Sequence, residues 1–120
     1  MARVRINAPV RIPAPGGKTI DEHVGLASDG RDAVSVAHMV APAGWSEPVQ
    51  TPDFDEVTIV VRGRLAVDGA GTRLEVKAGE SLLVERGTAV RYANPFGEPC
   101  EYWAVCVPAF SLARAGRAPD

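Results

Sequence analysis

The sequence of 120 residues contains few of the residue types that build redox and metal sites. It has two histidines, and its two cysteines, Cys100 and Cys106, form no Cys-x-x-Cys motif. Their spacing therefore indicates neither a dithiol redox centre nor a zinc knuckle. Cys106 lies in an apolar run, where a thiol that stays reduced is expected to behave as a small buried side chain.

Concentrated charge and long apolar runs are absent too. The net charge is −2, and the arginines are scattered singly, so no nucleic-acid partner is expected. No window has the length and apolarity of a membrane span, and the N-terminal stretch lacks the apolar segment of a signal peptide. We therefore expect a cytoplasmic protein with no membrane partner. Neither a serine or cysteine suitably spaced from a histidine nor a glycine-rich phosphate loop is present.

The sequence does contain many short β-rich segments, punctuated by twelve glycines and ten prolines. Strands are expected at 34–40, 56–62, 64–79 (two strands around a turn at Asp68-Gly69-Ala70-Gly71), 81–85, 88–94 and 101–110. This pattern predicts an all-β sandwich or barrel with little helix. Residues 19–32 are interpreted as a loop with at most one short strand. The tail is expected to be mobile or to form one helical turn.

Two stretches carry a resemblance to the cupin superfamily, small β-barrels of jelly-roll topology. The family motif G(x)5HxH(x)3–4E(x)6G fits the stretch from Gly44 to Gly63, with Glu56 in its place. The motif G(x)5PxG(x)2H(x)3N fits from Gly79 to Asn94. The Gly-Trp run, the acidic loop and the strand after it also look similar to the EutQ-like ethanolamine-utilisation group, which lacks the full histidine set.

The resemblance implies one cupin domain over residues 1–120, with two antiparallel sheets and a pocket between them. The core would span 34–107, the N-terminal strands and a loop 1–33, and the tail 108–120. Small cupins commonly pair through their N-terminal strands, so the RVRI and APVRIPA segments imply a homodimer.

The residues that grip a metal in typical cupins are largely replaced. Gln50 and Pro52 occupy the histidine positions of the first motif, and Val90 occupies that of the second. Proline and valine offer no side-chain donor, and an amide oxygen is a weak ligand for transition metals. No metal cofactor is therefore expected. If a metal did bind, a rebuilt site of His38, Glu47, Gln50 and Glu56 is the alternative.

Glu56 is the first candidate for catalysis. Alternation along its strand places it on the face of Thr58 and Val60, which the resemblance puts inside the barrel. A desolvated carboxylate there could act as a general base or anchor a ligand, although it could also sit at the mouth in an ion pair. Gln50, at a former ligand position, could orient a hydroxyl or carbonyl group in the same pocket.

His38 and Tyr92 are the candidate acids beside Glu56. His38 shares a face with Val36 and Val40, where it could be a packed core residue or could form a proton-shuttling dyad with Glu56. Tyr92 shares a face with Val90, so its side chain is expected to point inward, either as an acid or as filling.

The remaining candidates are ligand-binding residues. Val90 is expected to line the pocket, and Phe54 to form a lid over it or a dimer contact. Glu47 is a possible carboxylate of the site, and Trp103 could be a ligand platform or core packing. Either Tyr102, Ala104 and Cys106 or Trp103, Val105 and Val107 must face inward, and the sequence leaves this open. His23 is expected at the surface.

Together these residues lead us to expect a cupin that binds a small polar organic molecule. The first hypothesis is a metal-independent acid–base enzyme of the isomerase, epimerase, cyclase or lyase type. The second is a ligand-binding or sensor protein without catalysis, and the third is a metalloenzyme with the rebuilt site.

Overall fold

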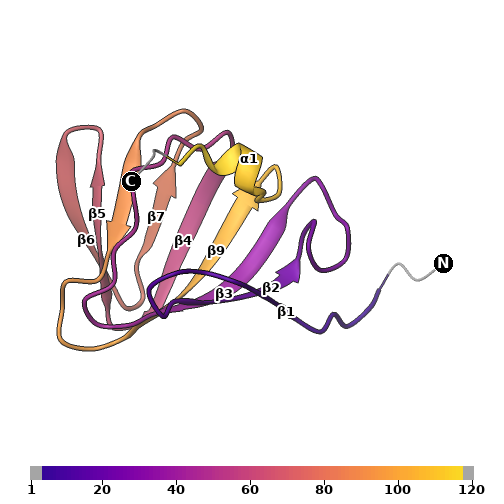
Figure 1. Ribbon diagram of the computed structural model, residues 1–120, viewed down its shortest axis with the longest axis horizontal. Coiled ribbons are helices and arrows are strands. Elements are labelled where there is room, and N and C mark those ends of the chain that lie inside the picture. Colours follow the sequence, from indigo (N-terminus) through magenta and orange to yellow (C-terminus); the bar gives the residue numbers. More distant parts are fainter. Residues whose placement is uncertain (1–3, 118–120) are drawn as a thin grey trace.

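The computed structural model describes residues 4–117, which form two antiparallel sheets and one short helix. The strands are β1 (Val10–Ile12), β2 (Thr19–Val24), β3 (Ser35–Ala41), β4 (Asp55–Arg62), β5 (Arg64–Gly69), β6 (Thr72–Lys77), β7 (Ser81–Val84), β8 (Val90–Ala93) and β9 (Cys100–Val107), and the helix is α1 (Leu112–Ala115). The larger sheet has the order β1-β2-β3-β9-β4-β7, and the smaller has β6-β5-β8 (Figure 1). The prediction of an all-β fold of two antiparallel sheets is confirmed.

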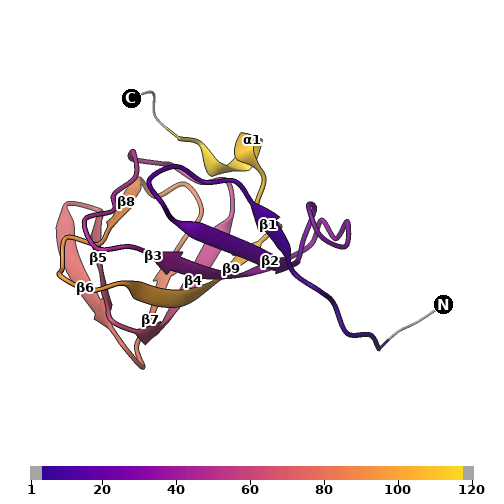
Figure 2. The ribbon, with the colours of Figure 1, turned by 60° about the horizontal axis from the view of Figure 1, so that its bottom comes forward.

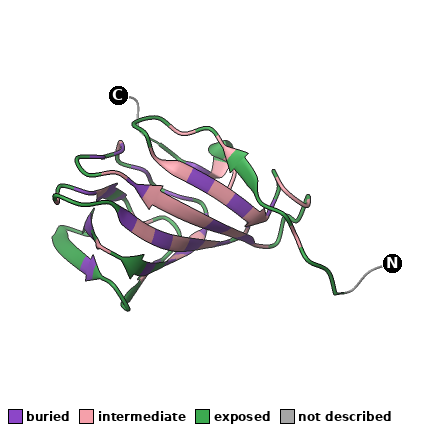
Figure 3. Ribbon diagram, turned by 90° about the horizontal axis from the view of Figure 1, so that it is seen from below, coloured by how far each residue is buried: buried purple, intermediate pink, exposed green. Residues whose placement is uncertain are grey.

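The two sheets enclose a common interior (Figure 2). Burial alternates along the strands of the larger sheet, as the banding in Figure 3 shows, because successive side chains point to opposite faces. β9 pairs with β3 on one side and with β4 on the other. Its inward set is Tyr102, Ala104 and Cys106, which settles the choice that the sequence left open.

The segment interpreted mainly as a loop contains the six-residue strand β2. Its inward positions include Ile20 and Glu22, and Glu22 is almost fully buried. The Glu22 carboxylate accepts hydrogen bonds from the backbone N–H groups of Ala27 and Ser28, both at 2.9 Å. Because the acidic residue Glu22 occupies an inward position of β2, the sequence lacks the alternation of apolar and polar residues that predicts a strand.

The C-terminal segment packs against the body as an ordered unit. Helix α1 begins after Ser111, whose hydroxyl accepts a hydrogen bond from the N–H of Arg114 at 3.1 Å. The N–H of Thr51 donates to the carbonyl of Gly116 at 2.9 Å, and a Cβ on Gly116 would lie 2.2 Å from the Thr51 carbonyl oxygen. This close approach requires glycine. Of the two alternatives for the tail, the structure shows the helical turn.

Two positions of the motifs have structural roles. Gly63 has a φ of 77°, and a Cβ there would lie 2.5 Å from the carbonyl oxygen of Pro99. Asn94 is fully buried, and its amide donates to the carbonyls of Ala41, Pro42 and Glu98 while its side-chain oxygen accepts from the N–H of Phe96. Gly63 and Asn94 are the last residues of the two motifs, and both stabilise the backbone of the barrel. The motif positions that persist therefore indicate the fold.

At the N-terminal end, β1 is an edge strand that pairs with β2, which agrees with the expectation for the APVRIPA segment. Arg3, at the start of the RVRI segment, and residues 118–120 of the tail lie outside the described residues. Among residues 4–117, no helix has the length and apolarity needed to cross a bilayer.

Candidate functional site

A cavity opens between the two sheets. It offers about 40 Å³ to the centres of water molecules, which suits a compact ligand. Its walls come from β1, β2, β3, β4, β8, β9 and the loops around them: Ile12, Lys18, Ile20, Glu22, Ser35, Ala37, Met39, Glu47, Gln50, Phe54, Glu56, Thr58, Tyr92, Tyr102, Ala104, Cys106, Phe110 and Arg117. A mostly apolar wall with a few converging polar groups is typical of a small-molecule site.

Glu56 lies in this cavity and is only 8% exposed. The hydroxyl of Tyr92 donates to its Oε1 at 2.8 Å, and the Cys106 thiol donates to its Oε2 at 3.6 Å. Burial raises the pKa of Glu56, while the hydrogen bond from Tyr92 and the charge of Lys18 act in the opposite direction. Burial and the neighbouring Glu56 raise the pKa of Tyr92, so its hydroxyl remains a proton donor at neutral pH.

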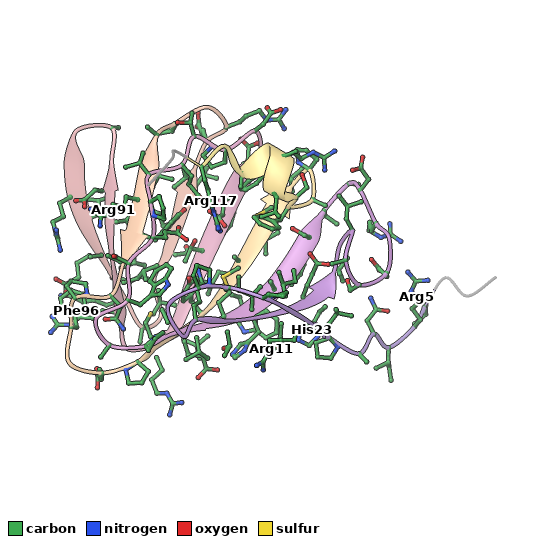
Figure 4. The ribbon with its side chains drawn as sticks, viewed as in Figure 1. Arg5, Arg11, His23, Arg91, Phe96 and Arg117 are labelled. Atoms are coloured by element: carbon green, nitrogen blue, oxygen red, sulfur yellow. The ribbon has the colours of Figure 1, made fainter. Side chains whose placement is uncertain are left out.

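A second carboxylate, that of Glu47, lines the same cavity and is 9% exposed. Its Oε2 lies 3.9 Å from Nη2 of Arg117, and burial raises the pKa of Glu47 against the charges of Lys18 and Arg117. Arg91 on β8 donates from Nε to the backbone carbonyl of Glu47 at 3.0 Å. Arg117, labelled in Figure 4, lines this cavity as well.

Lys18, in the loop before β2, brings a cation to the cavity. Its Nζ lies 4.3 Å from the centroid of the Trp45 ring and 5.2 Å from that of Tyr102. The residue is half-buried, but its ammonium end is enclosed. Burial lowers the pKa of Lys18, and the charges of Glu47 and Glu56 oppose this shift.

Among the predicted site residues, Glu56, Tyr92, Gln50, Glu47 and Phe54 all line the cavity. Glu56 shares a buried face with Thr58 and Val60, as alternation along β4 predicted. Gln50 is buried, and its backbone bridges both Val90 and Arg117. Phe54 is 1% exposed and lies 6.1 Å from the ring of Phe110, so it forms part of the wall instead of a lid or a dimer contact.

The pairing of His38 with Glu56 is wrong, because His38 lies on the outer face of β3 while Ser35 and Ala37 face the interior. Its Nε2 lies 2.7 Å from Glu101 Oε2, and its ring lies 5.0 Å from that of Trp103. Alternation had placed His38 with the correct neighbours but could not tell which face of the strand is inside.

Trp103 and Val90 also lie away from the cavity. Trp103 is on the outer face of β9, between the rings of His23 and His38, so it is no platform for an interior ligand. Val90 is 1% exposed and packs in the hydrophobic core beside the cavity. His23 is half-buried on the outer side, at the β1–β2 edge in Figure 4.

Lys18, Arg117 and Tyr102 were missed as site residues. Lys18 and Arg117 come from segments at opposite ends of the chain, and neither belongs to a motif or a clear strand. One signal was available: the sequence contains only two lysines, and Lys18 directly follows two glycines. Tyr102 belonged to one of two possible inward sets.

The interior does not fit the metal that typical cupins bind. Of the four positions that hold metal ligands in typical cupins, Glu56 alone keeps the family's residue. Both oxygens of its carboxylate already accept hydrogen bonds. Within residues 4–117, no group of three or more His, Cys, Asp or Glu side chains is arranged to hold a metal ion. The alternative set with His38 cannot form, because His38 is outside the barrel.

The two facing sheets and the walled interior define a β-barrel of jelly-roll type with a cavity between its sheets. A family model described as "Cupin domain" matches residues 37–108, and the chain belongs to this family. The structure of KdgF from Halomonas sp. aligns with a TM-score of 0.72 at 12% identity, over 85% of this chain and 88% of that one. A putative ethanolamine utilization protein Q from Salmonella typhimurium aligns with a TM-score of 0.62 at 17% identity, over 87% and 98%.

Among curated proteins, the chain is similar to "Endoribonuclease YbeY" of Myxococcus xanthus, with 50% identity over 107 residues. The aligned region is 89% of this chain but 36% of that protein. The chain therefore spans about a third of the length of this relative.

Proposed function

We propose that the cavity binds a small polar organic molecule and that Glu56 and Tyr92 carry out metal-independent acid–base chemistry on it. The observation that carries this proposal is the 2.8 Å hydrogen bond from the Tyr92 hydroxyl to the interior Glu56 carboxylate. A general base needs a raised pKa and access to its substrate, and the cavity wall provides both. Of the two candidate acids, Tyr92 lies beside Glu56, whereas His38 lies on the outer face of β3.

In this scheme Glu56 removes a proton from a carbon next to a carbonyl group. Return of that proton to another position or to the other face gives an isomerase or epimerase, and loss of a leaving group gives a lyase. The Tyr92 hydroxyl donates a hydrogen bond to the carboxylate and holds it in place. Gln50, whose backbone is fixed by two hydrogen bonds to Val90, orients the substrate through its amide.

The proposal is tested by hydrogen–deuterium exchange of carbon-bound protons. The protein is incubated in D2O with a panel of small hydroxyketones and keto acids, and proton NMR follows loss of the signal next to the carbonyl. Glu56→Gln is expected to lower the exchange rate by roughly 10²–10⁴-fold while the fold is kept. Glu75→Gln on the exposed strand β6 is the matched control. Equal exchange by wild type and Glu56→Gln contradicts the proposal.

A ligand-binding protein without catalysis is the second candidate. It is favoured by the fact that both oxygens of Glu56 accept hydrogen bonds from neutral donors, as in a static anchor. A thermal-shift screen that finds a tight ligand, combined with no exchange or turnover of that ligand, would support this candidate over the enzyme.

The name of the Myxococcus relative raises RNA cleavage as a third possibility. The matched region makes up 36% of that protein, so the named activity is not assigned to this region. The polar groups described above point into an enclosed cavity, and the net charge of the chain is −2. Phosphate backbones are bound by exposed basic surfaces, so we propose a small molecule as the ligand.

A further inference from the structure

The cavity of this protein contains two cations, Lys18 and Arg117, and neither donates a side-chain hydrogen bond to a carboxylate among residues 4–117. Lys18 has no carboxylate within 4.0 Å of its ammonium among residues 4–117, and its closest described partner is the face of Trp45. An enclosed ammonium without a hydrogen-bonded anion is costly, and an apolar side chain would fill the same space at lower cost. The charge is therefore unnecessary for packing.

Arg117 is the second cation. Its side chain is 33% exposed, and its contact with Glu47 is a single ion pair at 3.9 Å, which is too long for a hydrogen bond. A guanidinium has five N–H donors in a planar fork that matches a carboxylate. Among the described residues, no hydrogen bond uses these side-chain donors, so they remain available to a ligand.

The position of Arg117 is fixed by the backbone around it. Arg117 bridges to Gln50, Thr51 donates to the carbonyl of Gly116, and Asp53 donates to the carbonyl of Arg114 at 2.7 Å. The segment that follows α1 is thereby tied to the loop that leads into β4, the strand of Glu56. These backbone contacts hold Arg117 at the cavity, which suits a binding role.

From this geometry we infer that the ligand of the cavity carries a carboxylate and that Lys18 and Arg117 bind it. This inference rests on the proposed small-molecule function and names the substrate class. An organic cation is disfavoured, because the Trp45 face that would receive it already lies under the Lys18 ammonium. A neutral ligand would leave the Lys18 ammonium without an anion at hydrogen-bond distance.

The same arrangement places the carboxylate of the ligand beside the acid–base pair. Lys18 and Arg117 line the cavity together with Glu56 and Tyr92. A small 2-keto or 2-hydroxy acid would bind Lys18 and Arg117 through its carboxylate. The carbons next to that carboxylate would then lie in the part of the cavity that Glu56 lines. Lys18 and Arg117 are thus specificity-determining residues for small organic acids.

The two lysines of the chain allow a direct test, because Lys18 is in the cavity and Lys77 is exposed on β6. Protein labelled with ¹³C at lysine Cε shows one signal for each, and pyruvate, lactate, acetate and succinate are titrated at constant ionic strength. We expect at least one of these acids to shift the Lys18 signal saturably while the Lys77 signal stays in place. Acetamide and ethylammonium are expected to shift neither signal.

Two variants test the assignment of the cations. Arg117→Gln and Lys18→Met are each expected to weaken the affinity for the acid by at least about tenfold, whereas Arg73→Gln and Lys77→Met leave it unchanged. The Arg117→Gln titration still reads the Lys18 signal, and that of Lys18→Met is followed by calorimetry. If Lys18→Met fails to fold, Lys18→Arg replaces it and is expected to retain binding.

The inference is overturned if no acid of the panel shifts the Lys18 signal, if both lysine signals move in parallel, or if ethylammonium gives the larger shift. Glu56→Gln separates this inference from the proposed acid–base function. Retained acid binding in Glu56→Gln with undiminished exchange would remove the catalytic role of Glu56 and leave the carboxylate site standing. Exchange that requires Glu56 but shows no preference for carboxylate ligands would support the catalytic role of Glu56 and contradict the carboxylate site.

Discussion

At the scale of single residues, the two interior carboxylates should leave a signature in the pH dependence of stability. Burial raises the pKa of Glu47 and Glu56 above the usual 4.5. Between that pH and the raised value the folded state binds more protons than the unfolded state, so the free energy of unfolding falls as pH rises. The stability that these groups contribute is therefore fully present below pH 4.5 and lost as pH rises through their folded pKa values.

Glu56→Gln removes one of these groups, and its stability relative to wild type is expected to increase from pH 4.5 to neutral pH. Urea unfolding at both pH values measures the difference. Glu75→Gln, which changes an exposed side chain, is the control and should show no such trend. A gap between Glu56→Gln and wild type that is the same at both pH values would contradict the raised pKa.

What the sequence can predict about single residues is their relative orientation. Alternation correctly put Glu56 with Thr58 and Tyr92 with Val90, because successive side chains in a strand point to opposite faces. It could not say which face is inside, and for that reason His38 was paired with an interior partner. Loop residues such as Lys18 show no alternation that predicts their orientation. Lys18 and Glu56 line the same cavity only because the strands close into a barrel, which the local sequence does not reveal.

At the scale of elements, the strands from β3 to β9 were predicted with small errors at their ends, because their apolar alternation is regular. The hairpin of β5 and β6 shows where local signals mislead. The Asp68-Gly69 pair predicts a turn over Asp68-Gly69-Ala70-Gly71, but Gly69 is paired with Thr72, and the turn consists of Ala70 and Gly71. The cross-strand register extends the ladder past the residues that usually form such a turn.

Ala70 adopts a φ of 50°, in the left-handed region that disfavours a side chain with a Cβ. Ala70→Gly is therefore expected to raise the free energy of unfolding, by up to about 1 kcal/mol. Ala78→Gly, in the turn between β6 and β7 and without a positive φ, is the matched control and should lower it. Chemical denaturation of the two variants checks the prediction, which fails if Ala70→Gly is the less stable of the pair.

At the scale of the whole molecule, the N-terminal segment leaves apolar side chains in solvent. Val4 and Ile6 are 93% and 101% exposed, and the segment extends away from the barrel beyond the edge strand β1 (Figure 1). Extended apolar residues beside an unpaired strand edge favour pairing with another chain. We propose that two copies pair through these segments, as the resemblance to small cupins implies.

We therefore expect light scattering coupled to size-exclusion chromatography to give twice the mass of one chain. Replacing both Val4 and Ile6 by lysine should shift the mass to that of a monomer, because the two charges would be buried in the interface. Leu112→Lys is the control, since this residue is 76% exposed on α1 and lies away from the N-terminal segment. A dimer that survives the double substitution, or a wild type that is monomeric throughout, would show that the N-terminal segment has another role. Because Lys18 and Glu56 face the interior of a single barrel, the monomeric variant should still bind its ligand.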